Sequence, residues 1–422
     1  MIIIENNAQL LSFCQTNPKV LLLIPVWSSP RAHEYNTHLS FVYIRTKDSE
    51  YIINVNHIDA GKCDAIDFNL LTDNDTLVLG SRYLNTKGVD FEWVYFESYH
   101  KPFIFNEFVE SLYLGHRNDF KELNDCLPLM KWYEKLKTVP MVSDIRESDY
   151  IYSDRIKILG RLEGAGVAVD REKFIDRFKY PSQYLPTNIV HTKYNPYTTT
   201  GRPSNHHMNV NWAALNKSDG SRAVIVSRFE DGGSLIQFDY ESYHIRLIGK
   251  MVGYEFPIGM TAHAHLAQYY GVSVEEAKPI SFRYLYGGLD DMARNIPFFQ
   301  KVDTYIKKGY QQFVTSGALT TPIHKRKIDF KRIDTPTEQK VFNYLLQALE
   351  TEINYMRIRD ILDWLERKQS KLILYTYDAF VIDTHPSERD ELLNVLKPML
   401  ESGNFPVKTY EGMNYDSLIV IR

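Results

Sequence analysis

Cysteine is scarce in this chain of 422 residues, and its early part lacks a long hydrophobic run. The three cysteines, Cys14, Cys63 and Cys126, show no CxxC spacing. They therefore predict neither a disulfide framework nor a clustered metal site, and they fit a reducing cytosol. The longest early apolar run, residues 20–27, is too short to span a membrane, and the N-terminus lacks the basic segment of a signal peptide. We expect a cytoplasmic protein without a membrane partner.

The chain also lacks a large excess of either positive or negative charge. Forty-nine basic residues stand against 53 acidic ones, for a net charge of −4, which excludes a basic coat protein but not a basic face. Apolar residues make up 44% of the chain and exclude wholesale disorder. The abundant residues are 29 Tyr and 22 Phe, which usually fill cores but also stack on bases.

The first part of the chain reads as alternating strands and loops. Apolar runs at 20–27, 38–46 and 50–58 predict strands, and residues 106–115 predict a helix. This order favours an α/β layer with a mixed sheet over residues 1–115.

The rest of the chain is mostly helical in pattern, with few strands. A strand is expected at 234–240, and a hairpin at 372–384 with Asp378 at its bend. Residues 180–203 have loop composition. Helical patterns are found over residues 118–180, 275–316, 337–369 and 390–402. A further helix-prone stretch follows the strand at 234–240 and runs to about residue 268.

Three segments carry the chemistry. Asp239 ends an apolar strand, Asp378 lies at a bend, and Lys278, Phe282 and Tyr286 share one helix face by their i, i+4, i+8 spacing. Taken singly, such aspartates are usually caps or turn formers, and such a stripe is usually a half-buried face. Together, two carboxylates can hold two Mg²⁺ ions for in-line phosphoryl displacement. The lysine and rings then suit a nucleoside triphosphate.

Seven stretches match known motifs in a fixed order. FDYESYHIR (238–246) is similar to DYSQIELR, KPISFRYLYG (278–287) to a K…F/Y…YG helix, and TYDA (376–379) to VHDE. On these residues the chain resembles the A-family DNA polymerases, the bacterial Pol I and phage replicative group, over residues 155–422. Weaker landmarks are LEGAGVAVDREKF (162–174), TGRPS (200–204), TPIHKRKI (321–328) and FNYLLQALETE (342–352).

The resemblance implies an α+β fold shaped as a polymerase right hand. An antiparallel palm sheet is expected in 200–260 and 337–422, helical fingers in 261–336, and linker helices with a reduced thumb in 116–199. Residues 1–115 would form an α/β RNase H-like domain of the 3′–5′ exonuclease type. The implied enzyme is a template-directed DNA polymerase, a nucleotidyltransferase that extends a primer 3′ end with dNTPs in DNA replication. The reduced size favours a phage or other mobile element, and hence the host cytoplasm.

The resemblance also implies roles in the nucleotide site. Asp239, Asp378 and the Tyr240 carbonyl would bind two Mg²⁺ ions, for which Mn²⁺ can substitute. Lys278 would contact the triphosphate, Phe282 would stack near the nucleotide, and Tyr286 would guard the templating position.

Primer–template DNA is the second implied partner, and a processivity factor or other replication protein is a third candidate. Tyr377 replaces the family's histidine beside the primer end, where its hydroxyl can also donate. The other implied DNA contacts, which position rather than specify, are Thr200, Gly201, Arg202, Asn209, Asn211, Asn343 and Gln347.

Three departures from the family pattern bear on the mechanism. His244 replaces the glutamate that closes the floor under the sugar 2′ position. Ala379 replaces another glutamate, so a supporting carboxylate is expected to be missing. Val274 replaces an arginine, and the sequence leaves its substitute open among Arg283, Lys307 and Lys308.

Two larger differences concern whole domains. Only 29 residues separate Asp170 from Thr200, where the family has a long helical thumb. A basic run (Lys325, Arg326, Lys327, Lys331, Arg332) is either a compensating DNA surface or a solvated turn. The strand at 20–27 carries Pro25 and Trp27 where an exonuclease has Asp-x-Glu, so residues 1–115 are a degenerate exonuclease-like domain without proofreading activity, or an unrelated cap.

Two other functions fit part of the pattern. An RNA-synthesising or primer-making relative would share the two aspartates and the helix, and His244 weakens the argument against ribonucleotides. A non-catalytic, polymerase-shaped DNA-binding protein would explain Ala379 and Val274, but it has no reason to keep both aspartates and Lys278.

Overall fold

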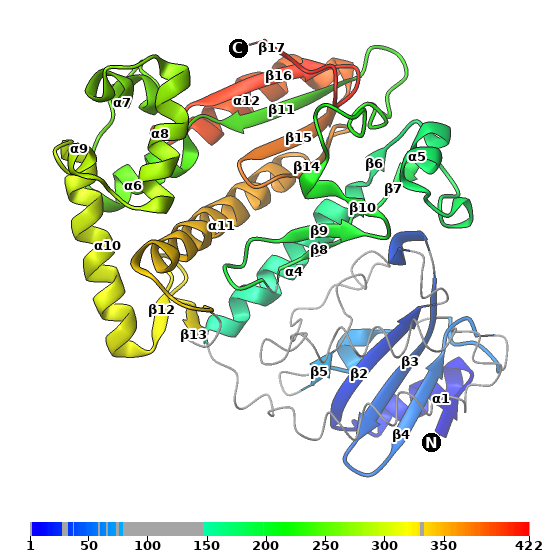
Figure 1. Cartoon of the computed structure of the whole chain (residues 1–422). Coiled ribbons are helices and arrows are strands. Elements are labelled where there is room, and N and C mark those ends of the chain that lie inside the picture. The colour runs from blue at the N-terminus through cyan, green and yellow to red at the C-terminus, as the bar shows by residue number, and fades with distance from the viewer. Residues whose placement is uncertain are drawn as a thin grey trace. The chain divides into compact units, whose positions relative to one another are not determined.

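The computed structural model of the chain (Figure 1) describes residues 2–27, 33–36, 38–57, 60–64, 66–72, 76–78, 147–196, 198–329 and 333–421. Its backbone forms two compact units. The N-terminal unit comprises Met1–Gly164 and Lys179–His191, and the C-terminal unit comprises Ala165–Phe178 and Thr192–Arg422. The helix expected at 106–115 lies outside the described residues, as does Cys126.

A five-stranded mixed sheet forms the N-terminal unit, in the order β1-β4-β3-β2-β5. Strands β2, β3 and β4 are antiparallel neighbours, whereas β1 runs parallel to β4 and β5 runs parallel to β2. The three predicted strands and the mixed sheet are thus confirmed. The strands are β1 Ile2–Ile4, β2 Val20–Trp27, β3 Leu39–Thr46, β4 Glu50–Asn54 and β5 Leu77–Val78.

Helix α1 (Asn7–Gln15) packs against this sheet. Its first turn is capped by Asn6, whose side chain accepts from the Gln9 amide at 2.9 Å. Leu10 and Phe13 on the helix join strand residues in one apolar core. Burial of these side chains is what stabilises so short a helix. Nearly all of helix α4 (Glu147–Ala165) also belongs to this unit, and the Tyr35 hydroxyl donates to its Gly160 carbonyl at 2.8 Å.

An antiparallel sheet of five strands forms the centre of the C-terminal unit, in the order β14-β15-β11-β16-β17. The strand expected at 234–240 is confirmed as β11, and the hairpin expected at 372–384 is confirmed as β14 and β15. Strand β11 lies between β15 and β16, so both of its edges are hydrogen-bonded. The strands are β11 Ser234–Tyr240, β14 Lys371–Tyr375, β15 Ala379–Thr384, β16 Val407–Gly412 and β17 Ile419–Val420.

Helices cover this sheet and extend away from it (Figure 1). The long helix α11 contacts β14 as well as α6, α8 and α10, and α12 contacts β16. A Ser273 capping box opens α8: the Ser273 Oγ accepts from the Glu276 amide, and the Glu276 carboxylate accepts from the Ser273 amide. The helices are α6 Tyr243–Val252, α7 Ala262–Tyr270, α8 Val274–Gly287, α9 Asp291–Arg294, α10 Pro297–Ser316, α11 Glu338–Trp364 and α12 Arg389–Glu401.

Two helix predictions were too long. The helix expected at 337–369 ends at Trp364, because the following turns redirect the chain into β14. The helical stretch expected over 118–180 is interrupted after α4, where Gly166 adopts a φ of 63°. Two short elements follow, β6 Val167–Ala168 and α5 Arg171–Phe178.

The segment between Asp170 and Thr200 is short and irregular. In its described part, α5 is followed by a single 3₁₀ turn and two-residue strands. The loop predicted from the composition of residues 180–203 is confirmed: none of the described residues in this stretch belongs to a long helix.

Candidate active site

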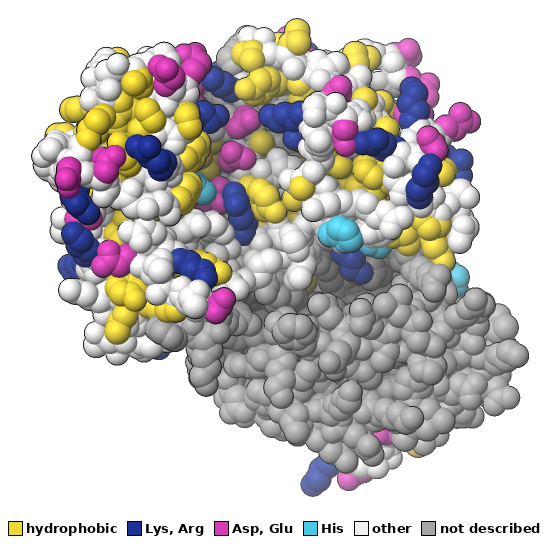
Figure 2. Space-filling view, in the orientation of Figure 1, with side chains coloured by type: hydrophobic (Ala, Val, Ile, Leu, Met, Phe, Trp, Pro, Cys, Tyr) yellow, Lys and Arg dark blue, Asp and Glu magenta, His cyan; other side chains and the backbone are white. Residues whose placement is uncertain are grey.

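A cavity of about 850 Å³ lies in the C-terminal unit, between the sheet and helices α6, α7, α8 and α11. Figure 2 shows acidic and basic side chains gathered around a hollow in this part of the surface. The structure brings nine of the predicted site residues together in its lining. They are Arg202, Asp239, Tyr240, His244, Lys278, Phe282, Tyr286, Tyr377 and Asp378.

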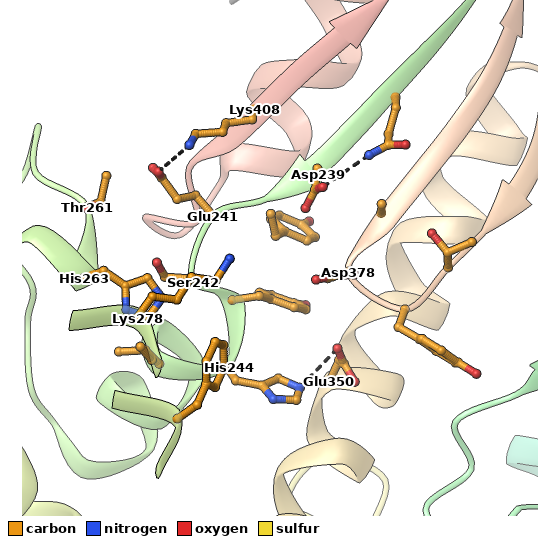
Figure 3. A pocket seen from close by; sticks show the side chains of 18 of the residues that line it. Asp239, Glu241, Ser242, His244, Thr261, His263, Lys278, Glu350, Asp378 and Lys408 are labelled. Atoms are coloured by element: carbon orange, nitrogen blue, oxygen red, sulfur yellow. Dashed lines mark hydrogen bonds and ion pairs between the residues drawn. The ribbon is translucent and has the colours of Figure 1, made fainter. Parts of the chain in front are cut away.

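Strand pairing places the two aspartates at the same end of the sheet. In the antiparallel register of β11 and β15, Asp239 lies opposite Ala379, the residue that follows Asp378. The Tyr240 amide donates to the Asp378 carbonyl at 3.0 Å, which extends the ladder past the end of β15. Both carboxylates therefore line the cavity from adjacent backbone positions (Figure 3).

The turn that carries Asp378 is strained. Tyr377 has a φ of 71°, a conformation that bulky side chains rarely adopt. The Asp378 amide donates to the Thr376 carbonyl at 3.0 Å, so a γ-turn is centred on Tyr377. Such a backbone costs of order 1–3 kcal/mol and persists only where the surroundings hold it.

Asn354, a fully buried residue of α11, holds this turn in place. Its amide nitrogen donates to the Tyr377 carbonyl and, at 3.1 Å, to the Tyr375 hydroxyl. Its amide oxygen accepts from the Tyr243 hydroxyl at 2.8 Å. From the other side, the Arg202 guanidinium stacks on the Tyr377 ring at 3.9 Å. Asn354 thus ties together the hairpin and the start of α6.

The two carboxylates carry poorly compensated negative charge. Burial, and then the charge of Asp378, raise the pKa of Asp239 to about 6, against the opposing effects of Lys217, Lys278 and a hydrogen bond from Gln237. Burial, and then the charge of Glu350, raise the pKa of Asp378. A divalent cation would relieve this repulsion, so the pair fits metal binding. The described residues contain no cluster of three or more His, Cys, Asp or Glu side chains with metal-binding geometry.

Helix α8 presents the cation and the rings opposite the carboxylates. The Phe282 and Tyr286 rings are nearly parallel, with centroids 6.0 Å apart, as their i, i+4 spacing predicts. Lys278 lies one turn before Phe282 and faces the same cavity.

His263, which the sequence analysis missed, joins this group from α7. Its ring lies 5.7 Å from that of Phe282. Burial, and then the charge of Lys278, lower the pKa of His263 to about 4. Its Nδ1 is buried, and none of the described residues hydrogen-bonds to it. In the sequence AHAHLA this histidine looks like any half-buried helix residue. Only its position near Lys278 in the structure indicates that it belongs to the site.

A buried carboxylate from α11 lies near the position where Ala379 provides none. The Glu350 side chain lies 3.1 Å from Arg202 Nε and 3.2 Å from His244 Nε2. The Nδ1 of His244 in turn hydrogen-bonds to the Tyr286 hydroxyl. The carboxylate of Glu350 therefore faces the same part of the cavity as Asp378, from a helix rather than from β15 (Figure 3).

The remaining predicted DNA-contact residues lie outside the cavity lining. The Thr200 hydroxyl donates to Gln347 at 3.5 Å, and Gln347 donates to Asn343 at 3.1 Å, so these three form one group near Arg202. Gly201, next to Thr200, has a φ of 77°. Asn209 donates to the Phe178 carbonyl at 3.1 Å, and Asn211 is exposed at the end of a short strand.

The three side chains that the sequence offered in place of the family's arginine do not line the cavity. Arg283 pairs with Asp290 at 3.5 Å and Lys307 with Asp303 at 2.6 Å, and neither they nor Lys308 line the cavity. The cations that do so, besides Arg202 and Lys278, are Lys217, Arg222 and Lys408. Lys408 pairs with Glu241 at 3.2 Å (Figure 3).

The predicted basic run is only partly exposed. Arg326 is buried and donates to the Thr199 carbonyl at 3.0 Å, so it is a structural residue rather than a surface cation. Lys325 donates to the Pro322 carbonyl at 2.6 Å, and Lys327 lies on a short strand. Lys331 and Arg332 lie outside the described residues.

Two aspartates on adjacent strands thus face a helix that bears a lysine and two aromatic rings, an arrangement that suits divalent metal ions and a nucleoside triphosphate. No family model matches the sequence. Over 264 residues, or 50% of this chain, the sequence is 26% identical to a DNA polymerase of Bacillus phage SP01, of which the chain spans 28%.

A solved structure has the same fold. It is the polymerase domain of Pol1 from M. smegmatis, in complex with DNA primer-template and dNTP. The match has a TM-score of 0.65 at 13% identity and covers 99% of this chain and 100% of that one. Together the two comparisons confirm the predicted resemblance to A-family DNA polymerases. Among the described residues, no helix is long and apolar enough to cross a membrane.

Proposed function

We propose that this chain is a template-directed DNA polymerase that extends a primer 3′ end with dNTPs. The observation that carries the proposal is the shared cavity of Asp239, Asp378 and Lys278, which are far apart in sequence. The similarity to a phage DNA polymerase and the fold shared with a Pol1 polymerase domain support it.

The subdomains of a right hand are part of this proposal. The antiparallel sheet within residues 200–260 and 337–422 would be the palm, and the helical region 261–336 would be the fingers. Residues 116–199 would hold a reduced thumb, which the short segment after Asp170 supports. Primer–template DNA would lie across the sheet, positioned by Arg202 and by the Thr200, Gln347 and Asn343 group.

Asp239, Asp378 and the Tyr240 carbonyl would hold two Mg²⁺ ions, with Mn²⁺ as a possible substitute. When bound, such a pair activates the attacking 3′ hydroxyl and neutralises charge on the leaving group. The uncompensated charge of the two carboxylates supports this assignment.

The other cavity residues would bind and orient the nucleotide. Lys278 would pair with the triphosphate, and the buried His263 Nδ1 beside it could hydrogen-bond to a phosphate oxygen. The parallel rings of Phe282 and Tyr286 would support the base and the templating position.

The test of the proposal is Asp378→Asn. This change should abolish primer extension while leaving primer–template binding nearly intact, because the carboxylate acts on the transition state. We expect a loss of at least about 10³-fold, typical for a central electrostatic group. Extension assays with Mg²⁺ and separate dNTP and NTP mixtures, beside a DNA-binding assay, measure both effects. A variant that keeps more than about a tenth of the wild-type rate would refute the metal-ligand role.

Two other functions are outcomes of the same assay. Preferential use of NTPs by the wild-type chain would favour an RNA- or primer-synthesising enzyme, for which His244 is the motivating residue. DNA binding without any extension would favour a non-catalytic accessory protein.

For residues 1–115 we propose a degenerate exonuclease-like domain without proofreading activity. The arrangement of β2, β3 and β4 as antiparallel neighbours, with β5 parallel to β2, supports an RNase H-like ancestry. Strand β2, which lies between β3 and β5, carries Pro25 and Trp27 and no carboxylate, whereas two-metal hydrolysis needs clustered carboxylates. Stepwise 3′ shortening of a labelled single strand in Mg²⁺, unaffected by Asp239→Ala, would contradict this proposal.

A further inference from the structure

Glu350 is a fully buried carboxylate at the point where several parts of the site meet. It extends from α11 and contacts Arg202 through both Nε (3.1 Å) and Nη2 (3.3 Å). Its other neighbour is His244, whose Nε2 lies 3.2 Å away. Glu350 lies within the FNYLLQALETE landmark (342–352), but the resemblance implies no role for it.

The contacts of Glu350 determine how the His244 ring holds its proton. The Glu350 carboxylate lies 3.2 Å from Nε2 of His244, so its negative charge favours the tautomer in which Nε2 carries the hydrogen. In the neutral imidazole, Nδ1 is then an acceptor. The Tyr286 hydroxyl must donate to it, and its hydrogen therefore points at His244 rather than into the cavity.

If the proposed polymerase function holds, His244 and Tyr286 lie under the sugar of a bound nucleotide. Along α8, Lys278 marks the phosphate end and Tyr286, two turns later, marks the base end. Asp239 and Asp378 mark the reacting phosphate. The sugar then lies between them, over His244 and Tyr286. These two side chains hydrogen-bond to each other, and His244 also faces Glu350.

We infer that Glu350 is a specificity-determining positioning residue, which selects deoxyribonucleotides by fixing the His244–Tyr286 pair as a closed floor under the sugar. With both groups held, an additional 2′ hydroxyl meets a filled surface. Without Glu350, the imidazole can change tautomer or rotate, and Tyr286 can turn its hydroxyl toward the sugar.

The first experiment compares Glu350→Gln with the wild-type protein in primer extension, using dNTPs and NTPs separately. The dNTP-to-NTP ratio of kcat/KM should fall by about tenfold, equivalent to about 1.4 kcal/mol, because the charge that orients His244 is lost. Glu352→Gln is the matched control. It is a buried glutamate of the same helix, but it accepts from Thr321 and from the amides of Ile323 and His324 instead. It should lower stability without changing the ratio.

A second experiment tests the coupling between Glu350 and His244. A glutamate at 244 could accept directly from the Tyr286 hydroxyl, but beside Glu350 it would create two buried like charges. His244→Glu and Glu350→Ala should each lower discrimination, and the double variant should recover most of it. Independent sites would give additive losses instead.

The outcomes separate this inference from the proposed function. If the wild-type chain extends primers and Asp378→Asn does not, the polymerase proposal stands whatever Glu350 does. A ratio for Glu350→Gln within about twofold of wild type, or additive losses in the double variant, would then overturn the role of Glu350. A wild-type chain that extends with neither nucleotide set would overturn the polymerase proposal, and this inference with it.

Discussion

Lys278 projects from the second turn of α8 into a cavity that also contains the two aspartates. Its proposed contact with the triphosphate should strengthen as charge grows on the leaving pyrophosphate. Lys278→Ala should therefore lower kcat/KM for dNTPs by a factor equivalent to about 2–4 kcal/mol, with little effect on duplex binding. Steady-state extension against dNTP concentration measures it.

Lys307→Ala is the matched control, because Lys307 pairs with Asp303 on α10 and does not line the cavity. It should leave kcat/KM unchanged. If Lys278→Ala changes kcat/KM by less than about threefold, Lys278 is an ordinary partly buried helix lysine.

The raised pKa of Asp239 predicts a pH effect on stability. Its folded-state pKa of about 6 lies above the ordinary value of 3.8. The group therefore favours folding while it is protonated, and this contribution is lost as the pH rises through about 6. In metal-free buffer at pH 8, Asp239→Asn should raise the Tm, because asparagine resembles the protonated form. The gain should disappear below about pH 4, where both states bind the proton.

Thermal unfolding with a chelator at several pH values tests this prediction. Mg²⁺ should raise the Tm of the wild-type protein at pH 8 and raise that of the variant less, because the ion needs the carboxylate. Asp231→Asn, at an exposed position, is the control. A lower Tm for Asp239→Asn at pH 8 without metal would contradict the assigned repulsion.

The sequence identified the residues whose type and spacing match a known chemistry, and it missed those whose role depends on tertiary burial. Asp239, Asp378 and the α8 stripe were predicted, and the structure brings them into one cavity. Glu350 and Asn354 were missed, because polar residues in a helix usually face solvent and only the packing of α11 against the hairpin and α6 buries them.

At the scale of elements, the hairpin of β14 and β15 depends on a polar residue from another element. Asn354 satisfies the Tyr377 carbonyl and the Tyr375 and Tyr243 hydroxyls. Asn354→Leu would keep the volume and leave these buried groups unpaired, at a cost of about 2–4 kcal/mol in the free energy of unfolding. Urea denaturation measures it. Tyr375→Phe, which removes one partner, should cost less.

Asn354→Leu should also slow primer extension more than it weakens DNA binding, because the strained turn at Tyr377 holds Asp378 in the cavity. Unchanged stability and rate in Asn354→Leu would show that the turn holds its own conformation.

Element boundaries followed from the sequence where local patterns decide them. Strand β11 was predicted with its observed bounds, because its apolar residues stand between two glycines, Gly232 and Gly233, and the charged Glu241. The ends of α4 and α11 were predicted less well. In the first, Gly166 and buried Val167 redirect the chain, and in the second, Ser370 is bound by Glu388 from a distant turn. Neither signal lies in the helical periodicity itself.

At the scale of the whole molecule, the order of the seven motifs predicted the polymerase fold better than any single motif did. Each segment alone fits an ordinary structural role, but their order along the chain constrains the topology.

Synthesis should be distributive and steeply salt-sensitive in the absence of a partner protein. The chain has a net charge of −4, and the described residues between Asp170 and Thr200 offer one eight-residue helix where a thumb would contact the DNA backbone. Phosphate contacts dominate affinity for DNA, and each contributes about 0.9 to the slope of log K against log salt.

With Arg326 buried, Lys325 and Lys327 are the described members of the basic run left to compensate. A double Lys325→Ala, Lys327→Ala variant should therefore shorten products and flatten the salt slope if they bind DNA. Single-hit extension on a long template at moderate salt measures product length. Addition of thousands of nucleotides per binding event by the chain alone would show that a reduced thumb does not limit its grip on DNA.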